Sequence, residues 1–327
     1  MLRRTLVGLA TAASVCLLAA GLAQAADYPA KPVALIAPYG PGGASDLAAR
    51  TLASSVPAYL GNAMIVTNRT GAAGVTGSTF VAKSKPNGYT LLLARVGSQV
   101  GVPAINTKIP YRWNDFTFLG LLELNPFVLV VNPDGPYTTF ADLENAVKAG
   151  HKISYSSAGV GTLLHIAVAV FADALGADFK RLKHIPYKGG GKAAAAVIGG
   201  HTDMSFQNLS AVIGAINSGQ LRALAVTTKE RFKAIKDVPT VGELGHPKLE
   251  AIVGWSGLYG PKGLPQSVID KWVDVLQSVK KDKSWNRLTI KLGSIPAISS
   301  PTAMESFAEA QFNTFRDITS RLGMTIK

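Results

Sequence analysis

Cysteine is nearly absent from this sequence, and the single residue, Cys16, lies in the N-terminal segment. The rest of the chain therefore has no disulfide, no thiolate nucleophile and no thiolate metal ligand. Its five histidines show no His-Glu-x-x-His spacing and have no cysteine companions, a pattern that argues against a zinc site. We predict neither a metal nor a cofactor.

Acidic residues are also scarce, because 20 Asp and Glu stand against 33 Lys and Arg and give a formal net charge of +13. Such a long-range field favours anionic partners. The basic residues are scattered along the chain, however, and no basic helix or array of stacking aromatics accompanies them. Nucleic acid is therefore a poor fit, and a small anionic ligand is a better one.

Long apolar runs are missing except at the N-terminus. A run over residues 6–22 follows two arginines and precedes the small-x-small triplet Ala23-Gln24-Ala25, which is the pattern of a cleaved export signal. We predict a signal peptide over residues 1–26, removed near Ala25 or Ala26. The two arginines also leave open a twin-arginine signal, although they are a normal charged start.

The remaining chain of about 300 residues exceeds the size at which one hydrophobic core stops growing, so we predict two lobes. Short apolar runs typical of buried strands alternate with glycine loops and helical stretches, beginning with residues 33–37, 40–43 and 44–61. This alternation indicates an α/β fold in which mixed, mostly parallel sheets are flanked by helices. Strong turn chemistry after residues 127–131 places a crossover between the lobes nearby.

Two glycine loops precede helices, one in each half of the chain, at Gly40 to Asp46 and at Gly159 to His165. The first backbone N–H groups of a helix have no internal partner, and its dipole adds roughly half a positive charge at that end. Two such ends facing across a cleft would hold a carboxylate reversibly. Either loop alone is more readily explained as a turn, and it is the presence of two, one in each half, that favours a site. Neither matches the dinucleotide fingerprint.

Several polar residues near these loops are candidates for ligand contact, each with an ordinary structural alternative. Ser45 and Thr162 either donate to the ligand or cap their helices. Arg95 ends an apolar strand, where its planar fork either grips a second carboxylate or forms an internal ion pair. Gln207 and Asn208 either select the rest of the ligand or form a surface turn.

Catalytic motifs are incomplete in this chain. The segment Gly254-Trp255-Ser256-Gly257-Leu258 lacks the last glycine of a nucleophile elbow, and Ala193 follows Lys192 where a phosphate loop needs Ser or Thr. We therefore predict a binding protein and not an enzyme. A secreted hydrolase or lyase on the same fold is the alternative from a different class.

A set of short motifs, in this order, resembles the substrate-binding receptors of tripartite tricarboxylate transporters, often called the Bug family: Tyr28-Pro29-x-Lys31-Pro32, Pro41-Gly42-Gly43-x-x-Asp46, Asn68-Arg69-x-Gly71-Ala72-x-Gly74, Pro86-x-Gly88-Tyr89-Thr90-Leu91, Pro186-Tyr187-Lys188-Gly189, Gly199-Gly200, Leu224-Ala225-Val226-Thr227 and Val238-Pro239-Thr240-Val241-x-Glu243. The resemblance implies a periplasmic type II binding protein, a Venus flytrap whose α/β lobes are joined by crossing strands. It also implies delivery of a small di-, tri- or aromatic carboxylate to permease subunits in the inner membrane. A sensor that reports ligand to a two-component kinase is the runner-up, because it differs only in its partner.

On this basis we expect a monomer with lobe I over residues 27–124 and 227–327 and lobe II over residues 125–226. The family pinches one carboxylate between the two glycine loops, largely through main-chain groups, and Arg95 departs from its usual small neutral residue. If Arg95 faces the cleft, the ligand has a second acidic group. The expected ligand-binding residues are Tyr39, Gly42, Gly43, Ala44, Ser45, Asp46, Arg95, Ser98, Gly159, Val160, Gly161, Thr162, His165, Tyr187, Gln207 and Asn208.

Overall fold

The computed structural model describes residues 28–325 of the chain. The predicted signal peptide, its cleavage site near Ala25 and Cys16 lie outside the described residues. Within residues 28–325, no helix has both the length and the apolar character that a membrane span requires.

A curled sheet of ten strands organises this part of the chain, and its main path has the order β2-β1-β3-β9-β4-β7-β5-β6, with β8 and β10 also paired to β4. The strands are β1 (Val33–Ala37), β2 (Met64–Asn68), β3 (Thr90–Arg95), β4 (Phe116–Val131), β5 (Ser154–Ser157), β6 (Lys183–Pro186), β7 (Met204–Asn208), β8 (Arg222–Val226), β9 (Val253–Pro261) and β10 (Ile295–Pro296).

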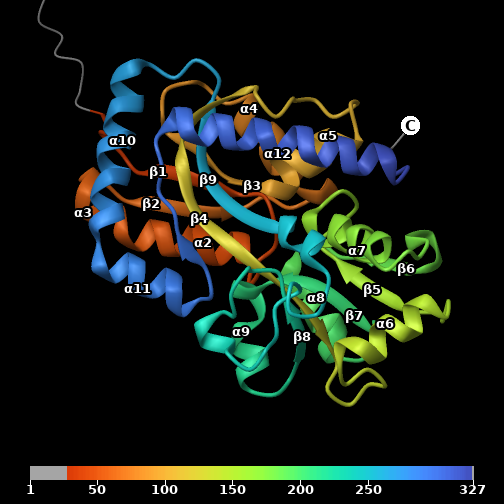
Figure 1. Ribbon diagram of the computed structural model, residues 1–327. Helices are drawn as coiled ribbons and strands as arrows, with labels where there is room; N and C mark the ends of the chain where they lie inside the picture. Colours follow the sequence, from red (N-terminus) through yellow and green to blue (C-terminus); the bar gives the residue numbers. More distant parts are fainter. Residues whose placement is uncertain (1–27, 326–327) are drawn as a thin grey trace, which may run out of the picture.

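The direction of the strands divides the sheet into two lobes. Strand β1 is parallel to β2 and β3, and β5 is parallel to β6 and β7. Every antiparallel pairing in the described chain involves β4 or β9. Strand β4 pairs with β9 along its first part and with β7 and β8 along its second, so it crosses from one lobe to the other (Figure 1). We call the part built on β1, β2, β3 and β10 lobe I, and the part built on β5 to β8 lobe II.

Helices flank both lobes (Figure 1). Lobe I has α2 (Ala44–Ser55), α3 (Pro57–Leu60), α4 (Val75–Ala82), α5 (Val102–Ile105), α10 (Gln266–Lys281), α11 (Lys283–Lys291) and α12 (Pro301–Arg321), while lobe II has α6 (Phe140–Lys148), α7 (Leu163–Ala174), α8 (Gly190–Ile198) and α9 (Leu209–Asn217). Helix α12 packs on β4 and α5, and α2 of lobe I contacts α9 of lobe II. Short helical turns lie at η1 (Ala72–Gly74) and η2 (Gly97–Gly101).

The apolar runs form strands because both faces of the sheet are covered. In β3, Leu91 and Leu93 belong to one hydrophobic cluster and Leu92 to another, as the period of two along a strand requires. Each of the three is fully buried, which contributes about 1.5–3 kcal/mol per side chain. The strands are therefore a rigid platform, and the loops that follow them are held in place.

The expected elements occur with two corrections. The strand predicted over residues 33–37 is β1. The helix expected over residues 44–61 is divided at Val56 into α2 and α3, because Pro57 has no N–H and starts a new helix at its first position. The strand expected over residues 127–131 is only the end of β4, which begins at Phe116.

Candidate ligand-binding site

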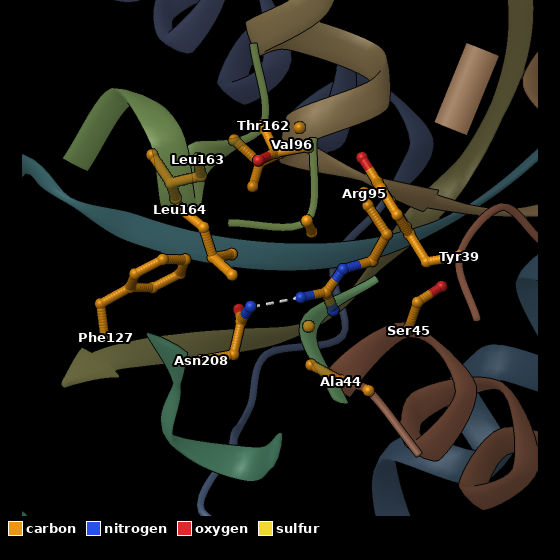
Figure 2. A pocket seen from close by; sticks show the side chains of 14 residues that line it. Tyr39, Ala44, Ser45, Arg95, Val96, Phe127, Thr162, Leu163, Leu164 and Asn208 are labelled. Carbon is orange, nitrogen blue, oxygen red and sulfur yellow. Dashed lines mark hydrogen bonds between the residues drawn. The ribbon is translucent and has the colours of Figure 1, made fainter. Parts of the chain in front are cut away.

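A cavity opens between the lobes where β3 and α2 face α7 and β7 (Figure 2). Its interior measures about 40 Å³, and about 420 Å³ when the open space at its mouth is counted; we call it the inner cavity. Its wall is formed by Tyr39, Gly43, Ala44, Ser45, Arg95, Val96 and Gly97 of lobe I, Phe127 of β4, and Ala158, Thr162, Leu163, Leu164, Gly190 and Asn208 of lobe II.

The start of α2 forms the lobe I side of this wall. Gly42 has a φ of 75°, a left-handed conformation that glycine adopts without strain. Among the described residues, the backbone N–H groups of Ala44, Ser45 and Asp46 have no hydrogen-bond acceptor. The hydroxyl of Ser45 is buried and also has no partner there. Lobe I thus presents main-chain donors and one hydroxyl.

Asp46 holds this loop and does not line the inner cavity. Its carboxylate accepts hydrogen bonds from the N–H of Gly42 (3.1 Å), from Arg50 (3.0 Å) and from Asn68 (3.0 Å). Burial alone raises the pKa of Asp46, but the hydrogen bonds from Arg50, Gly42 and Asn68 outweigh burial and lower it below the usual value. The charge of Asp46 is therefore neutralised locally and does not repel an anion in the cavity.

The start of α7 lies opposite. Gly159 and Gly161 have φ values of 129° and 80°, so the chain turns tightly before Thr162. The hydroxyl of Thr162 donates to the Gly159 carbonyl (2.7 Å), so this hydroxyl stabilises the loop. Within residues 28–325, the N–H groups of Leu163 and Leu164 lack acceptors. A second pair of main-chain donors therefore lies at the wall on the lobe II side.

A third helix start reaches the same cavity and was not predicted. Gly190, the first residue of α8, lines the wall, and the loop before it touches lobe I because the N–H of Gly40 donates to the Lys188 carbonyl (3.2 Å). The signal in the sequence was the run Gly189-Gly190-Gly191 before an alanine-rich helix. Local sequence preference predicts a helix over residues 193–198 only, because glycine is unfavourable inside helices.

Arg95 ends β3 at the floor of the cavity, and only 4% of its surface is exposed. It donates to the Ser256 hydroxyl and to the Asn208 side-chain oxygen (3.0 Å), and Nη1 lies 3.7 Å from the Glu123 carboxylate. Figure 2 shows the guanidinium directed toward Asn208. Burial lowers the pKa of Arg95, and the charge of Glu123 partly offsets this. The internal ion pair of the second interpretation is present, and Arg95 also lines the cavity. Its grip on a second carboxylate stays a prediction.

The nucleophile-elbow interpretation of Ser256 fails on this geometry. Ser256 is fully buried, accepts from Arg95 and donates to Glu123 (2.8 Å). Among residues 28–325, no histidine hydrogen-bonds to it, and no cluster of three or more metal-ligating side chains occurs in that range.

A stack of three rings supports the lobe II loop from below. The rings of His165 and His184 are 4.3 Å apart, and Tyr155 stacks on His184 at 4.8 Å. His165 Nδ1 accepts the N–H of Gly161 (3.1 Å), and His184 Nε2 lies 2.6 Å from the Ser157 hydroxyl. Burial lowers the pKa of His165 to about 3, with a further contribution from His184, whose own pKa burial lowers to about 4. Both imidazoles are neutral and fix the loop.

The remaining predicted residues lie outside the inner cavity. Gly159, Val160 and Tyr187 line a neighbouring cavity between the lobes. Ser98 is fully buried behind Arg95 and its hydroxyl donates to the Arg95 carbonyl (3.3 Å). Gln207 is fully buried and donates to Ser205.

The chain is similar in sequence and in structure to known receptors. The family described as tripartite tricarboxylate transporter family receptor matches residues 48–324. Protein BugT of Bordetella pertussis is 31% identical over 307 residues, which are 93% of this chain and 93% of BugT.

Two solved structures show the same fold. The periplasmic binding protein BugD is 30% identical, with a TM-score of 0.87 over 92% of this chain and 100% of BugD. An R. palustris protein solved with adipate is 25% identical, with a TM-score of 0.85 over 91% of this chain and 99% of that protein. The predicted two-lobed α/β fold is confirmed.

Proposed function

The chain belongs to the tripartite tricarboxylate transporter receptor family, and from that premise we propose that it captures a small di-, tri- or aromatic carboxylate in the inner cavity. The family match confirms the resemblance seen in the motifs. The relatives that define the family and the fold are binding proteins, which supports a receptor role without catalysis. The receptor works in the periplasm and delivers its ligand to permease subunits of a membrane transporter.

The observation that carries this proposal is the set of unpaired main-chain donors at the inner cavity. The starts of α2 and α7 present the N–H groups of residues 44–45 and 163–164, and α8 begins at Gly190 in the same wall. Each helix start adds roughly half a positive charge. The nearby carboxylates of Asp46 and Glu123 are compensated by Arg50 and Arg95, so the cavity favours an anion.

Arg95 supports a ligand with a second acidic group. Its fork has five N–H donors, and the hydrogen bonds to Ser256 and Asn208 use two of them. The relative solved with adipate, a diacid, is consistent with this ligand class. A second acidic group of the ligand would reach the guanidinium.

The two lobes of the proposed receptor meet at β4 and β9. We place lobe I at residues 27–124 and 227–327 and lobe II at residues 125–226, since β4 leaves β9 for β7 after Pro126. A monomer serves this function because both walls of the cavity come from one chain. The alternative role, in which the receptor reports its ligand to a two-component kinase, would use the same binding site.

A thermal-shift screen of the mature chain tests the proposal. Mono-, di-, tri- and aromatic carboxylates are compared with amides of the same shape, which lack the negative charge. An acid at 100 times its Kd should add about 2.7 kcal/mol to the free energy of unfolding, and its amide should add far less. Carboxylate capture would be refuted if acids and their amides stabilised the protein equally, or if none of the acids stabilised it.

A further inference from the structure

A second cavity lies between the lobes next to the inner one, and we call it the outer cavity. Tyr39 and Ala158 line both cavities, so the two cavities are neighbours that share this part of their walls. The outer cavity has a volume of about 410 Å³, against about 40 Å³ for the inner one. The outer cavity therefore falls within the roughly 300–1,000 Å³ of small-ligand sites, whereas the inner one has room for a carboxylate group only.

The wall of the outer cavity is mainly apolar and comes from both lobes. Lobe I contributes Ala72, Ala73, Val75, Val102 and Ile109, and lobe II contributes Val160 among others. Val160 is 42% exposed and is one of few large aliphatic side chains of the described chain that solvent reaches. Because Val160 also lines the outer cavity, its exposed methyl groups are available to an apolar part of a ligand.

The lobe I wall contains a strained loop that a hydrogen bond holds in place. Ala72 and Ala73 have φ values of 45° and 55°, a left-handed conformation that costs energy for residues other than glycine. The Tyr39 hydroxyl donates to the Ala73 carbonyl (2.8 Å). A Cβ atom at Gly97 would lie 2.8 Å from that hydroxyl oxygen, so the glycine leaves room for the ring. Two methyl groups are thus presented to the outer cavity by a loop fixed through Tyr39.

From these contacts we infer that the outer cavity binds the apolar body of the ligand, so that this receptor prefers carboxylates with an alkyl chain or an aromatic ring over compact acids. The inference rests on the proposed function, because the carboxylate must first be held in the inner cavity. The chain or ring then passes between Tyr39 and Ala158 and lies against Val160, Ala72 and Ala73.

Calorimetric titration of the mature chain with linear monocarboxylates of two to eight carbons tests this inference. Each methylene buried in the outer cavity should lower the Kd about fourfold until the cavity is filled. Val160→Ser should reduce this gain per methylene, and Val160→Ile should preserve it. Ile65→Ser is the matched control, because Ile65 is an aliphatic residue of β2 that is 56% exposed and lines neither cavity.

The outcomes separate the two proposals. If short and long acids bind with the same Kd, or if Val160→Ser leaves the gain per methylene unchanged, the outer cavity does not bind the ligand body while carboxylate capture stands. If no member of the series or of the wider carboxylate screen binds, the proposed function itself fails. An equal loss in Ile65→Ser would show that the effect of Val160→Ser is unrelated to the cavity.

Discussion

Gly101→Ala should weaken ligand binding without weakening the fold. Gly101 has helical backbone angles (φ −62°, ψ −52°), so alanine fits its conformation. In the structure, a Cβ atom at Gly101 would clash with the carbonyl oxygen of Gly161, which belongs to lobe II. It would also lie 3.2 Å from Ile166 Cδ1 of the same lobe. The clash exists only when the lobes are together, so the substitution acts against closure.

The size of the effect follows from the clash. Overpacking of one methyl group against backbone costs about 1–3 kcal/mol, and this cost falls on the closed state alone. Because apparent affinity scales with the fraction of molecules able to close, the Kd should rise about 5- to 150-fold. Stability without ligand should stay the same or rise, since alanine is favoured over glycine in a helix by up to about 1 kcal/mol.

Titration calorimetry with a ligand from the screen gives the Kd, and small-angle scattering with and without ligand gives the compaction. Gly214→Ala is the control, because Gly214 lies in α9 with nothing within 4 Å of its Cβ position and should change neither quantity. If Gly101→Ala binds and compacts like the wild type, the lobes do not approach at Gly101 in the bound state, and the reasoning is wrong.

Two further predictions concern charged and titratable groups. Arg95→Ala should clearly weaken the binding of diacids and weaken that of monoacids little, as measured by calorimetry. Equal losses would exclude a second acidic group at this position. The variant should also unfold at a lower temperature, because leaving the buried Glu123 without its partner typically costs about 3–5 kcal/mol. The free energy of unfolding should fall as the pH drops below about 6.5. In the unfolded chain both histidines bind a proton near that pH, whereas in the folded chain His165 and His184 stay neutral down to their lowered pKa values of about 3 and 4. For His165 the loss reaches at most about 2 kcal/mol at pH 5. A double substitution of both histidines by Gln should flatten the unfolding temperature between pH 7 and 5, and a slope equal to the wild type would contradict this assignment.

The local pattern of the sequence was sufficient for the strands with continuous apolar runs and for the two glycine loops. Strand β1 and the starts of α2 and α7 fall where the residues predict them, because these features depend on neighbours in the chain. The first part of β4 was missed since Gly120, Glu123 and Asn125 interrupt its apolar pattern. In the structure the register of β4 against β9 shifts just before Gly120 and again just before Glu123, and Arg95 of β3 compensates the charge of Glu123.

The parts of the site that were missed depend on contacts between distant residues. The start of α8 reaches the inner cavity because Gly40 meets Lys188, and no local pattern links these positions. Glycine is unfavourable inside helices, so local preference does not predict that α8 begins as early as Gly190. The orientation of Arg95 was likewise open, because Ser256, Asn208 and Glu123 come from three other strands or strand ends.

The lobes touch one another through bare main chain at Gly40 and Gly189, whose Cβ position would lie 3.0 Å from the nitrogen of Gly40. Main-chain atoms are the same whatever residues surround them. Substitutions at Val160 or Arg95 can therefore change the ligand specificity of the site without changing the contact between the lobes. In such a receptor, ligand specificity can evolve while the contact that joins the closed lobes stays the same.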